Sequence, residues 1–445
     1  MIKRGAYAVM KKTLLIVLIT ICLCMSFCGC AFIDDTDDLV SPPKLTGEME
    51  PIAKALYKAA GNDCDLRYPA AGNYRSAIVL EDIDGDGILE AFAFYSTSGD
   101  EMTTMHINAI CEEDKKWVSV ADQTIVATGV EMVDFSDLNN DGKKEILVGW
   151  DVNGTNEKQL SVFSFDEKTL TQQMLQPYTN FLCCDIDENG LNEVFVHHLN
   201  AVEKTNRASV YSYDGKSVLE TAYCDMDKSV KSATVPVLST LPNGKTAIYI
   251  DEIKGVGAVT EVLYHADGEL KNPLLDVANS RENVSTLRAA SISTQDINGD
   301  GKLEIPVASD LPNAQIGGEK LYYTNWCVFN GEKLSVKMVT VVNTVDGYYL
   351  NVPNNMVGYL AVIKDIENHK REFYHYDSHN DVLGKLLFTI SAIDANDWDR
   401  EDYDRGSKVE LDRSGNVVFV VSLGDGASAF AITTDFIKAT FKLVS

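Results

Sequence analysis

The chain has 445 residues, 45% of them hydrophobic, which is enough for a large core or for several domains. Acidic residues outnumber basic ones by 66 to 39, so the formal net charge is −27. A chain with this charge repels nucleic acid and anionic lipid. We therefore expect no nucleic-acid partner, and we expect the acidic groups to favour cation binding.

The N-terminus has the pattern of an export signal. Lys11 and Lys12 precede an apolar run over 13–27, and Cys28-Gly29-Cys30 follows. A basic start, an apolar run of about fifteen residues and a small residue before the cut describe a signal peptide. The run is short for a membrane span. We assign residues 1–29 to this signal, and translation from Met10 instead of Met1 would give the same pattern.

The end of the signal resembles the lipobox of bacterial lipoproteins, with Gly29 before Cys30. The resemblance implies a diacylated Cys30 that anchors the mature chain to the outer face of a bacterial cell membrane. Plain secretion and an uncleaved anchor are the alternatives. Residues 30–45 read as a disordered acidic tether, and residues 46–69 as a lead-in segment with a helix over 48–61.

Six cysteines lie beyond the leader, and none of them falls in a CxxC metal pattern. Disulfides are permitted outside the cytosol. We expect mostly buried thiols, and one disulfide of unassigned pairing stays open. The six are Cys64, Cys111, Cys183, Cys184, Cys224 and Cys327.

A nine-residue acidic motif occurs four times without gaps. Its pattern is D-x-[DN]-x-[DN]-G-x-x-E, and an alternating apolar stretch follows every copy. The copies start at Asp82, Asp137, Asp185 and Asp296, which are 55, 48 and 111 residues apart. The last interval spans two repeats, and Pro242-Asn243-Gly244-Lys245 stands where the missing copy would fall.

A second repeated element alternates with the acidic motif. Strand patterns at 162–165, 210–213, 262–264 and 326–329 each run into a tight turn and a second strand. One unit is thus strand, acidic loop, strand and hairpin, and four strands in about 50 residues make a propeller blade. The sequence predicts an all-β β-propeller over 70–445.

Counting these units gives seven four-stranded blades, with six or eight as alternatives. The sixth unit lies around 356–387 and has no acidic loop, and the last begins near Lys408. How the ring closes does not follow from the sequence.

The acidic motifs have the chemistry of a calcium site, because calcium takes six to eight oxygen ligands. Positions 1, 3, 5 and 9 supply side-chain oxygens, and position 7 supplies a backbone carbonyl. Glycine at position 6 suits a turn that a Cβ atom would strain. We predict up to four calcium ions, bound most tightly by the loop at Asp82 with its four carboxylates. The predicted ligands are Asp82, Asp84, Asp86, Ile88, Glu90, Asp137, Asn139, Asp141, Lys143, Glu145, Asp185, Asp187, Asn189, Leu191, Glu193, Asp296, Asn298, Asp300, Lys302 and Glu304.

An EF-hand begins in the same way but needs a bidentate glutamate at position 12. Ala93, Val148, Val196 and Val307 occupy that position here, within strand-like stretches. The motif followed by a strand instead resembles the FG-GAP/VCBS repeats of integrin-α-like propellers, well over 70–310 and poorly over 311–445. That resemblance implies calcium in loops that join two strands, and a solvated acidic turn is the alternative.

Two further stretches could bind a ligand. His369, His375 and His379 could hold zinc, although solvent-facing turn histidines are the more common outcome. Residues 394–404 combine acids and aromatics, which could grip a sugar or a cationic peptide. A solvated loop is again the more common explanation.

The sequence carries no G-x-S-x-G, P-loop, dinucleotide-binding or H-E-x-x-H motif, so we expect no catalytic residues. The predicted function is that of a lipid-anchored, monomeric, non-catalytic module that binds an extracellular protein or glycan. A structural role in envelope assembly is one alternative. An enzyme acting on extracellular polysaccharide is another, since a catalytic carboxylate pair cannot be singled out among so many acids.

Overall fold

The computed structural model describes residues 47, 49–99, 104–152, 158–312 and 320–444. The predicted signal peptide, the predicted lipidation site Cys30 and the acidic tether lie outside these ranges. Within them the fold is all-β and antiparallel, as the sequence predicts.

The described residues form six sheets that follow one another in sequence, and we number them in chain order. Sheet 1 contains β1 (Cys64–Leu66), β2 (Ile78–Glu81), β3 (Glu90–Thr97), β4 (Thr104–Glu113) and β5 (Lys116–Val126). Sheet 2 contains β6 (Gly129–Ser136), β7 (Glu145–Asp151), β8 (Lys158–Asp166) and β9 (Thr169–Tyr178). Sheet 3 contains β10 (Asn180–Cys184), β11 (Glu193–Asn200), β12 (Thr205–Tyr213) and β13 (Val218–Asp225).

The second half of the chain has larger and less regular sheets. Sheet 4 contains β14 (Ser232–Ala233), β15 (Val237–Thr240), β16 (Thr246–Lys254), β17 (Gly257–Ala266), β18 (Glu269–Lys271) and β19 (Arg288–Ala289). Sheet 5 contains β20 (Ile305–Asp310), β21 (Tyr322–Phe329), β22 (Leu334–Asn343), β23 (Tyr348–Asn351) and β29 (Phe441–Leu443). Sheet 6 contains β24 (Leu360–Asp365), β25 (Lys370–Asp377), β26 (Val382–Asp394), β27 (Val409–Ser414) and β28 (Val417–Leu423).

Neighbouring sheets pack face to face, as the blades of a propeller do. Because side chains alternate across a strand, each inner strand serves two interfaces. Ile248 and Ile250 of β16 join the apolar cluster shared with sheet 3, whereas Ala247 and Tyr249 join the cluster shared with sheet 5. Equivalent apolar clusters lie between sheets 1 and 2, 2 and 3, and 5 and 6.

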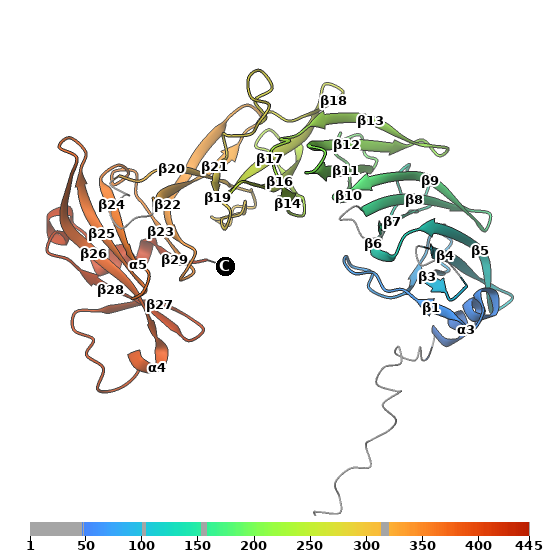
Figure 1. The fold of residues 1–445 in the computed structure, drawn as a ribbon, viewed down its shortest axis with the longest axis horizontal. Coiled ribbons are helices and arrows are strands. Elements are labelled where there is room, and N and C mark those ends of the chain that lie inside the picture. The colour runs from blue at the N-terminus through green and yellow to red at the C-terminus, as the bar shows by residue number, and fades with distance from the viewer. Residues whose placement is uncertain (1–46, 48, 100–103, 153–157, 313–319, 445) are drawn as a thin grey trace, which may run out of the picture.

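The six sheets form an open arc (Figure 1). Sheets 1 and 6 lie at its two ends and do not meet. Strand β29 returns to pair with β23 of sheet 5. Among the described residues, therefore, no strand pairing joins the first sheet to the last.

The estimate of seven blades is not confirmed, because the described residues form six sheets. The two units predicted around 356–387 and after 408 belong to one sheet, since β26 pairs with β28 from Phe388 to Asp394. Strand β26 is thirteen residues long and bridges the two units.

In the described part of the chain, four short helices accompany the sheets. Helix α3 (Met49–Ala60) falls in the segment expected to be helical, and its buried Ile52 and Leu56 pack on sheet 1. The others are α4 (Ala395–Trp398), the 3-10 helix η1 (Ala427–Phe430) and α5 (Thr434–Thr440). Of the helices in the described ranges, none has the length and apolar character needed to cross a bilayer.

Candidate functional site

The four acidic loops occupy one topological position. Three of them join two paired antiparallel strands, as predicted: 82–90 joins β2 to β3, 137–145 joins β6 to β7, and 185–193 joins β10 to β11. The fourth loop, 296–304, is enclosed by an isolated antiparallel bridge between Gln295 and Glu304, and β20 begins at the next residue. A strand follows each loop, which excludes the helix of an EF-hand.

The first half of every loop is fastened by the aspartate at position 1. Its Oδ2 accepts a hydrogen bond from the backbone N–H of the glycine at position 6. In loop 185–193, for example, Gly190 N lies 2.9 Å from Asp185 Oδ2. That glycine has φ of +91°, which the missing Cβ permits. The same bond measures 3.1 Å at Gly87, 3.0 Å at Gly142 and 2.7 Å at Gly301.

The second half is fastened by the glutamate at position 9, which turns inward. Glu304 is fully buried, and its Oε2 accepts the N–H of Ile297 at 3.1 Å. The residue at position 2 donates the same bond in the other loops. The distances are 3.2 Å for Ile83 to Glu90, 3.1 Å for Leu138 to Glu145 and 3.1 Å for Ile186 to Glu193.

Burial raises the pKa of these inward glutamates. The pKa of Glu90, of Glu145 and of Glu193 rises to about 7, and that of Glu304 rises as well. The negative aspartates of each loop add to the effect. A bound divalent cation would reverse this trend by favouring the ionised carboxylate.

Two of the four loops gather three carboxylates closely enough to share one ion. In one, oxygens of Asp82, Asp84 and Asp86 all lie within 4.8 Å of one another. In the other, Asp185, Asp187 and Glu193 meet the same condition. Hard carboxylate oxygens are the ligands that calcium prefers, so these two donor sets fit it.

The other two loops have asparagine at position 3 and gather fewer carboxylates. Asn139 Nδ2 donates to Asp141 at 3.1 Å, and Asn298 Nδ2 donates to Asp300 at 3.2 Å. Each amide would have to turn its oxygen inward to serve as a ligand. The position-7 carbonyls of Ile88, Lys143, Leu191 and Lys302 stay predicted ligands, while the N–H of each is bound by the side chain at position 5.

The segment at 241–245 takes the place of a fifth acidic loop, as the spacing indicated. It joins β15 to β16 through a tight turn in which Gly244 N donates to Leu241 O at 2.8 Å. It lacks carboxylates and supplies no equivalent of the other four sites.

The histidines at 369, 375 and 379 do not come together as one metal site. His369 Nδ1 lies 2.6 Å from Asp346 Oδ1, which accepts the hydrogen bond, and His375 stacks on Phe430 with ring centroids 4.3 Å apart. Among the described residues, no metal-type cluster contains them. In the stretch 394–404, Trp398 is buried in a small core, so its ring is not presented to a sugar.

The six cysteines beyond the leader are all free thiols in the described structure. Cys111, Cys184 and Cys327 are buried, and the other three are partly buried. This agrees with the expectation of mostly buried thiols, and no disulfide links any of the six.

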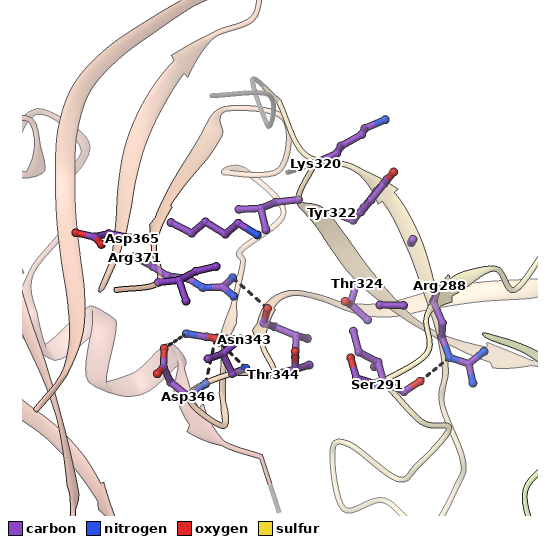
Figure 2. A pocket seen from close by; sticks show the side chains of 18 of the residues that line it. Arg288, Ser291, Lys320, Tyr322, Thr324, Asn343, Thr344, Asp346, Asp365 and Arg371 are labelled. Carbon is purple, nitrogen blue, oxygen red and sulfur yellow. Dashed lines mark hydrogen bonds between the residues drawn. The ribbon is translucent and has the colours of Figure 1, made fainter. Parts of the chain in front are cut away.

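One pocket, which we call the basic pocket, was not suggested by the sequence. It has a volume of about 270 Å³ and lies where sheets 4, 5 and 6 meet (Figure 2). Of the described residues, five basic and two acidic ones line it, in a chain whose net charge is −27. The basic ones are Arg288, Lys320, Lys364, Lys370 and Arg371.

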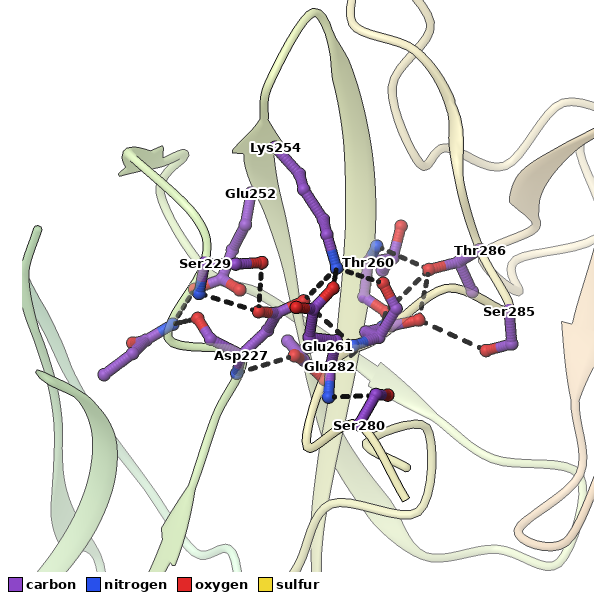
Figure 3. Close-up of polar contacts among 12 residues, drawn as sticks. Asp227, Ser229, Glu252, Lys254, Thr260, Glu261, Ser280, Glu282, Ser285 and Thr286 are labelled. Atoms are coloured by element: carbon purple, nitrogen blue, oxygen red, sulfur yellow. Dashed lines mark hydrogen bonds and ion pairs between the residues drawn. The ribbon is translucent and has the colours of Figure 1, made fainter. Parts of the chain in front are cut away.

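A second unpredicted feature is a buried carboxylate network between sheets 3 and 4 (Figure 3). Asp227, Glu252 and Glu261 are all fully buried there. Lys254 reaches Asp227 Oδ2 at 2.8 Å, and Asn206 Nδ2 donates to Glu252 Oε1 at 2.7 Å. Glu252 Oε2 has no hydrogen-bond partner among the described residues. The network lies beside the apolar cluster between the two sheets and links them through the hydrogen bond of Asn206 to Glu252.

No protein-family model matches the chain, and no curated protein matches it. Solved structures that resemble it include the Bacillus licheniformis rhamnogalacturonan lyase PL11, at 12% identity and a TM-score of 0.31, with 75% of this chain and 73% of that one covered. The exotype rhamnogalacturonan lyase YesX gives 9% identity and a TM-score of 0.30, with 73% and 83% covered. The Dos1 propeller gives 9% identity and a TM-score of 0.26, with 79% and 68% covered. Values this low assign neither a family nor an activity, and the propeller-type architecture rests on the sheets themselves.

Proposed function

We propose that this chain is an exported, lipid-anchored, calcium-binding module that recognises an extracellular protein or glycan and performs no chemistry on it. The FG-GAP/VCBS resemblance belongs to this proposal. One observation carries it: four loops at equivalent positions share one hydrogen-bond pattern, and two of them bring three carboxylates within reach of a single ion.

Calcium would have a structural role in this module. The loops are already fastened by their own N–H groups, so an ion would find the carboxylates largely in place. It would screen their mutual repulsion and tie two strands of one sheet together. The blades would then present a rigid surface to the ligand.

The test is thermal unfolding of the mature chain carrying Cys30→Ser, with excess calcium and with a chelator. A ligand that binds only the folded state raises its stability, so calcium should raise the Tm. An unchanged Tm at neutral pH would remove calcium from the proposal. Magnesium at the same concentration is the control, since it binds oxygen sites of this size less readily.

The lipid anchor has a separate test. Expressed with its native N-terminus in a bacterial host, the chain should fractionate with membranes and be released by Cys30→Ser. Release of both forms into the medium would indicate plain secretion.

Recovery of one stable protein partner, with no glycan binding, would favour a role in envelope assembly instead.

A further inference from the structure

A long segment crosses one end of sheet 4. We call residues 272–287, between β18 and β19, the strap, and they form turns and bends. At its start, Asn272 Nδ2 donates to the carbonyl of Asp225 in sheet 3 at 3.2 Å. Just after its end, Arg288 pairs with Asp251, 2.7 Å away, on the face of β16 that is turned to sheet 5. The strap therefore runs from sheet 3 across the hairpin of β16 and β17.

One lysine holds the middle of the strap. Lys254 Nζ lies 2.7 Å from Glu282 Oε2 and donates to the carbonyl of Asn283 at 3.1 Å (Figure 3). The same ammonium group contacts Asp227, whose Oδ2 also accepts the N–H of Asn283 at 2.9 Å. Asp227 and Asn283 are fully buried. The strap is therefore fastened by charge-assisted contacts in its middle as well as at its ends.

The fastened part of the strap lies against the two buried glutamates of sheet 4. Asn283 Nδ2 is 3.5 Å from Glu261 Oε2. Glu252 lies on the same face of the neighbouring strand, and its Oε2 is a buried atom without a hydrogen-bond partner among the described residues. A carboxyl oxygen in that position has lost the hydration that water would give it. Lifting the strap would let water reach the pair.

The charges around this pair do not balance. The titratable groups that face the pair or Lys254 come from sheet 3, from the segment before β14, from β16 and from the strap. They are His197, Cys224, Asp227, Lys254 and Glu282. Burial lowers the pKa of His197 to about 4 and raises that of the Cys224 thiol, so both side chains are neutral near pH 7. Lys254 is thus the one cation of these five, and two carboxylates already contact it.

The pair therefore keeps a proton while the strap is closed. Burial raises the pKa of Glu252 and of Glu261 above the ordinary value near 4.5, and repulsion from Glu261 raises that of Glu252 further. Water that reached the pair would bring both pKa values back toward the ordinary one. The closed strap thus binds more protons than the open one. Closure is strongest at pH 4.5 and below, and it weakens as the pH rises.

We propose that the strap is a latch at the joint between sheets 3 and 4, closed over the glutamate pair in acid and opening locally as the pH rises. Three sheets lie on either side of this joint, so the latch sits at the middle of the open arc (Figure 1). The inference goes beyond the proposed function, because it needs neither calcium nor an extracellular ligand. It concerns a local opening that leaves the six sheets folded.

Amide hydrogen exchange of the mature Cys30→Ser chain, in calcium buffer at pH 5.5 and pH 7.5, measures this opening. Protection factors are compared, because they remove the effect of pH on the intrinsic exchange rate. We expect the protection of residues 276–287 to fall by about tenfold or more between the two pH values, since opening releases about one proton. Glu252→Gln and Glu261→Gln cannot ionise and should each remove most of this fall. The matched control is Glu269→Gln, exposed on β18 of the same sheet, which should leave the fall unchanged.

Strand β7 of sheet 2 reports unfolding of the whole chain, and its amides should stay better protected than the strap at both pH values. Equal protection of the strap and β7 would mean that the strap opens only when the whole fold does, which would overturn the latch. A strap protection that does not change with pH would overturn it as well. Both comparisons use the parent chain, so they hold even if a glutamine variant fails to fold. An unchanged fall in both glutamine variants would assign the proton to other groups and overturn the role of the pair.

Discussion

Glu252 and Glu261 lie on one face of sheet 4, on the neighbouring strands β16 and β17, and both are fully buried. Glu261 accepts the N–H of Asp227 at 3.2 Å, whereas one oxygen of Glu252 has no hydrogen-bond partner among the described residues. Burial raises the pKa of both carboxyls, and their mutual repulsion raises that of Glu252 further. Asp227, Lys254 and His197 also face this pair. The folded state therefore holds a proton here that the unfolded chain would release.

The pair should make the protein less stable as the pH rises above the ordinary carboxylate range near 4.5. Over that window the folded state binds more protons than the unfolded state, so the free energy of unfolding falls with pH. Glu252→Gln mimics the protonated carboxyl and removes this loss. We expect it to stabilise the protein at pH 8 by about 1 kcal/mol or more and to have little effect at pH 5. Urea unfolding at pH 5 and pH 8 measures the effect of the substitution on the free energy of unfolding. Equal effects at the two pH values would contradict a proton held by this pair in the folded state.

The acidic loops should bind calcium independently of one another. Asp82→Asn removes one charge from the loop with the most carboxylates and should lower the bound calcium by one ion per chain. The matched control is Asp267→Asn, an exposed aspartate at the turn between β17 and β18, which should leave the count unchanged. Metal analysis after dialysis against low calcium gives both counts. A full count in Asp82→Asn would show that this loop holds no ion.

The inward glutamates should stabilise the fold even without metal. Glu145 is 3% exposed, and it accepts the N–H of Leu138 at 3.1 Å. Glu145→Ala leaves that donor buried and unpaired, which costs about 1–3 kcal/mol. Glu145→Gln keeps an acceptor at the same place and should cost less. Urea unfolding in chelator compares the two variants, and equal losses would mean that the hydrogen bond contributes little.

The sequence was sufficient to predict the loops because their chemistry is local. A glycine such as Gly142, with φ of +85°, and an aspartate five residues before it define the turn within a single short segment. The flanking strands follow from alternation of apolar residues, so the order of strand, loop, strand and hairpin is readable as well. Because the unit is repeated, the same order of elements is predicted for most of the chain.

Features that depend on distant pairing could not be predicted in this way. The merging of two predicted units into sheet 6 rests on contacts such as Ile390 with Val421, and alternation does not say which strand is the partner. The basic pocket likewise needs three sheets to meet, and Asn206 reaches Glu252 only because sheets 3 and 4 pack together. Each of these residues reads as an ordinary surface or strand residue in its own segment.

A glycine in sheet 2 illustrates such a distant requirement and gives the last prediction. Gly149 lies in β7 with an ordinary φ, but a Cβ atom added there would stand 2.1 Å from Tyr178 Oη and 3.4 Å from Phe181. Tyr178 is buried, and its hydroxyl has no hydrogen-bond partner among the described residues. Gly149→Ala should therefore destabilise the protein by about 1–3 kcal/mol, as overpacked cores do.

Combining Gly149→Ala with Tyr178→Phe removes the hydroxyl that clashes and should recover part of that loss. Tyr178→Phe alone should cost little, because its hydroxyl makes no hydrogen bond that would be broken. Thermal unfolding of the two single variants and the double variant forms a complete cycle. Additive losses would show that the new methyl group clashes with the backbone around it and not with the ring of Tyr178. A double variant that loses less stability than the sum of the two single losses would confirm the clash with the tyrosine hydroxyl. Glycine would then be required at this position of β7 because Tyr178 of β9 packs against it.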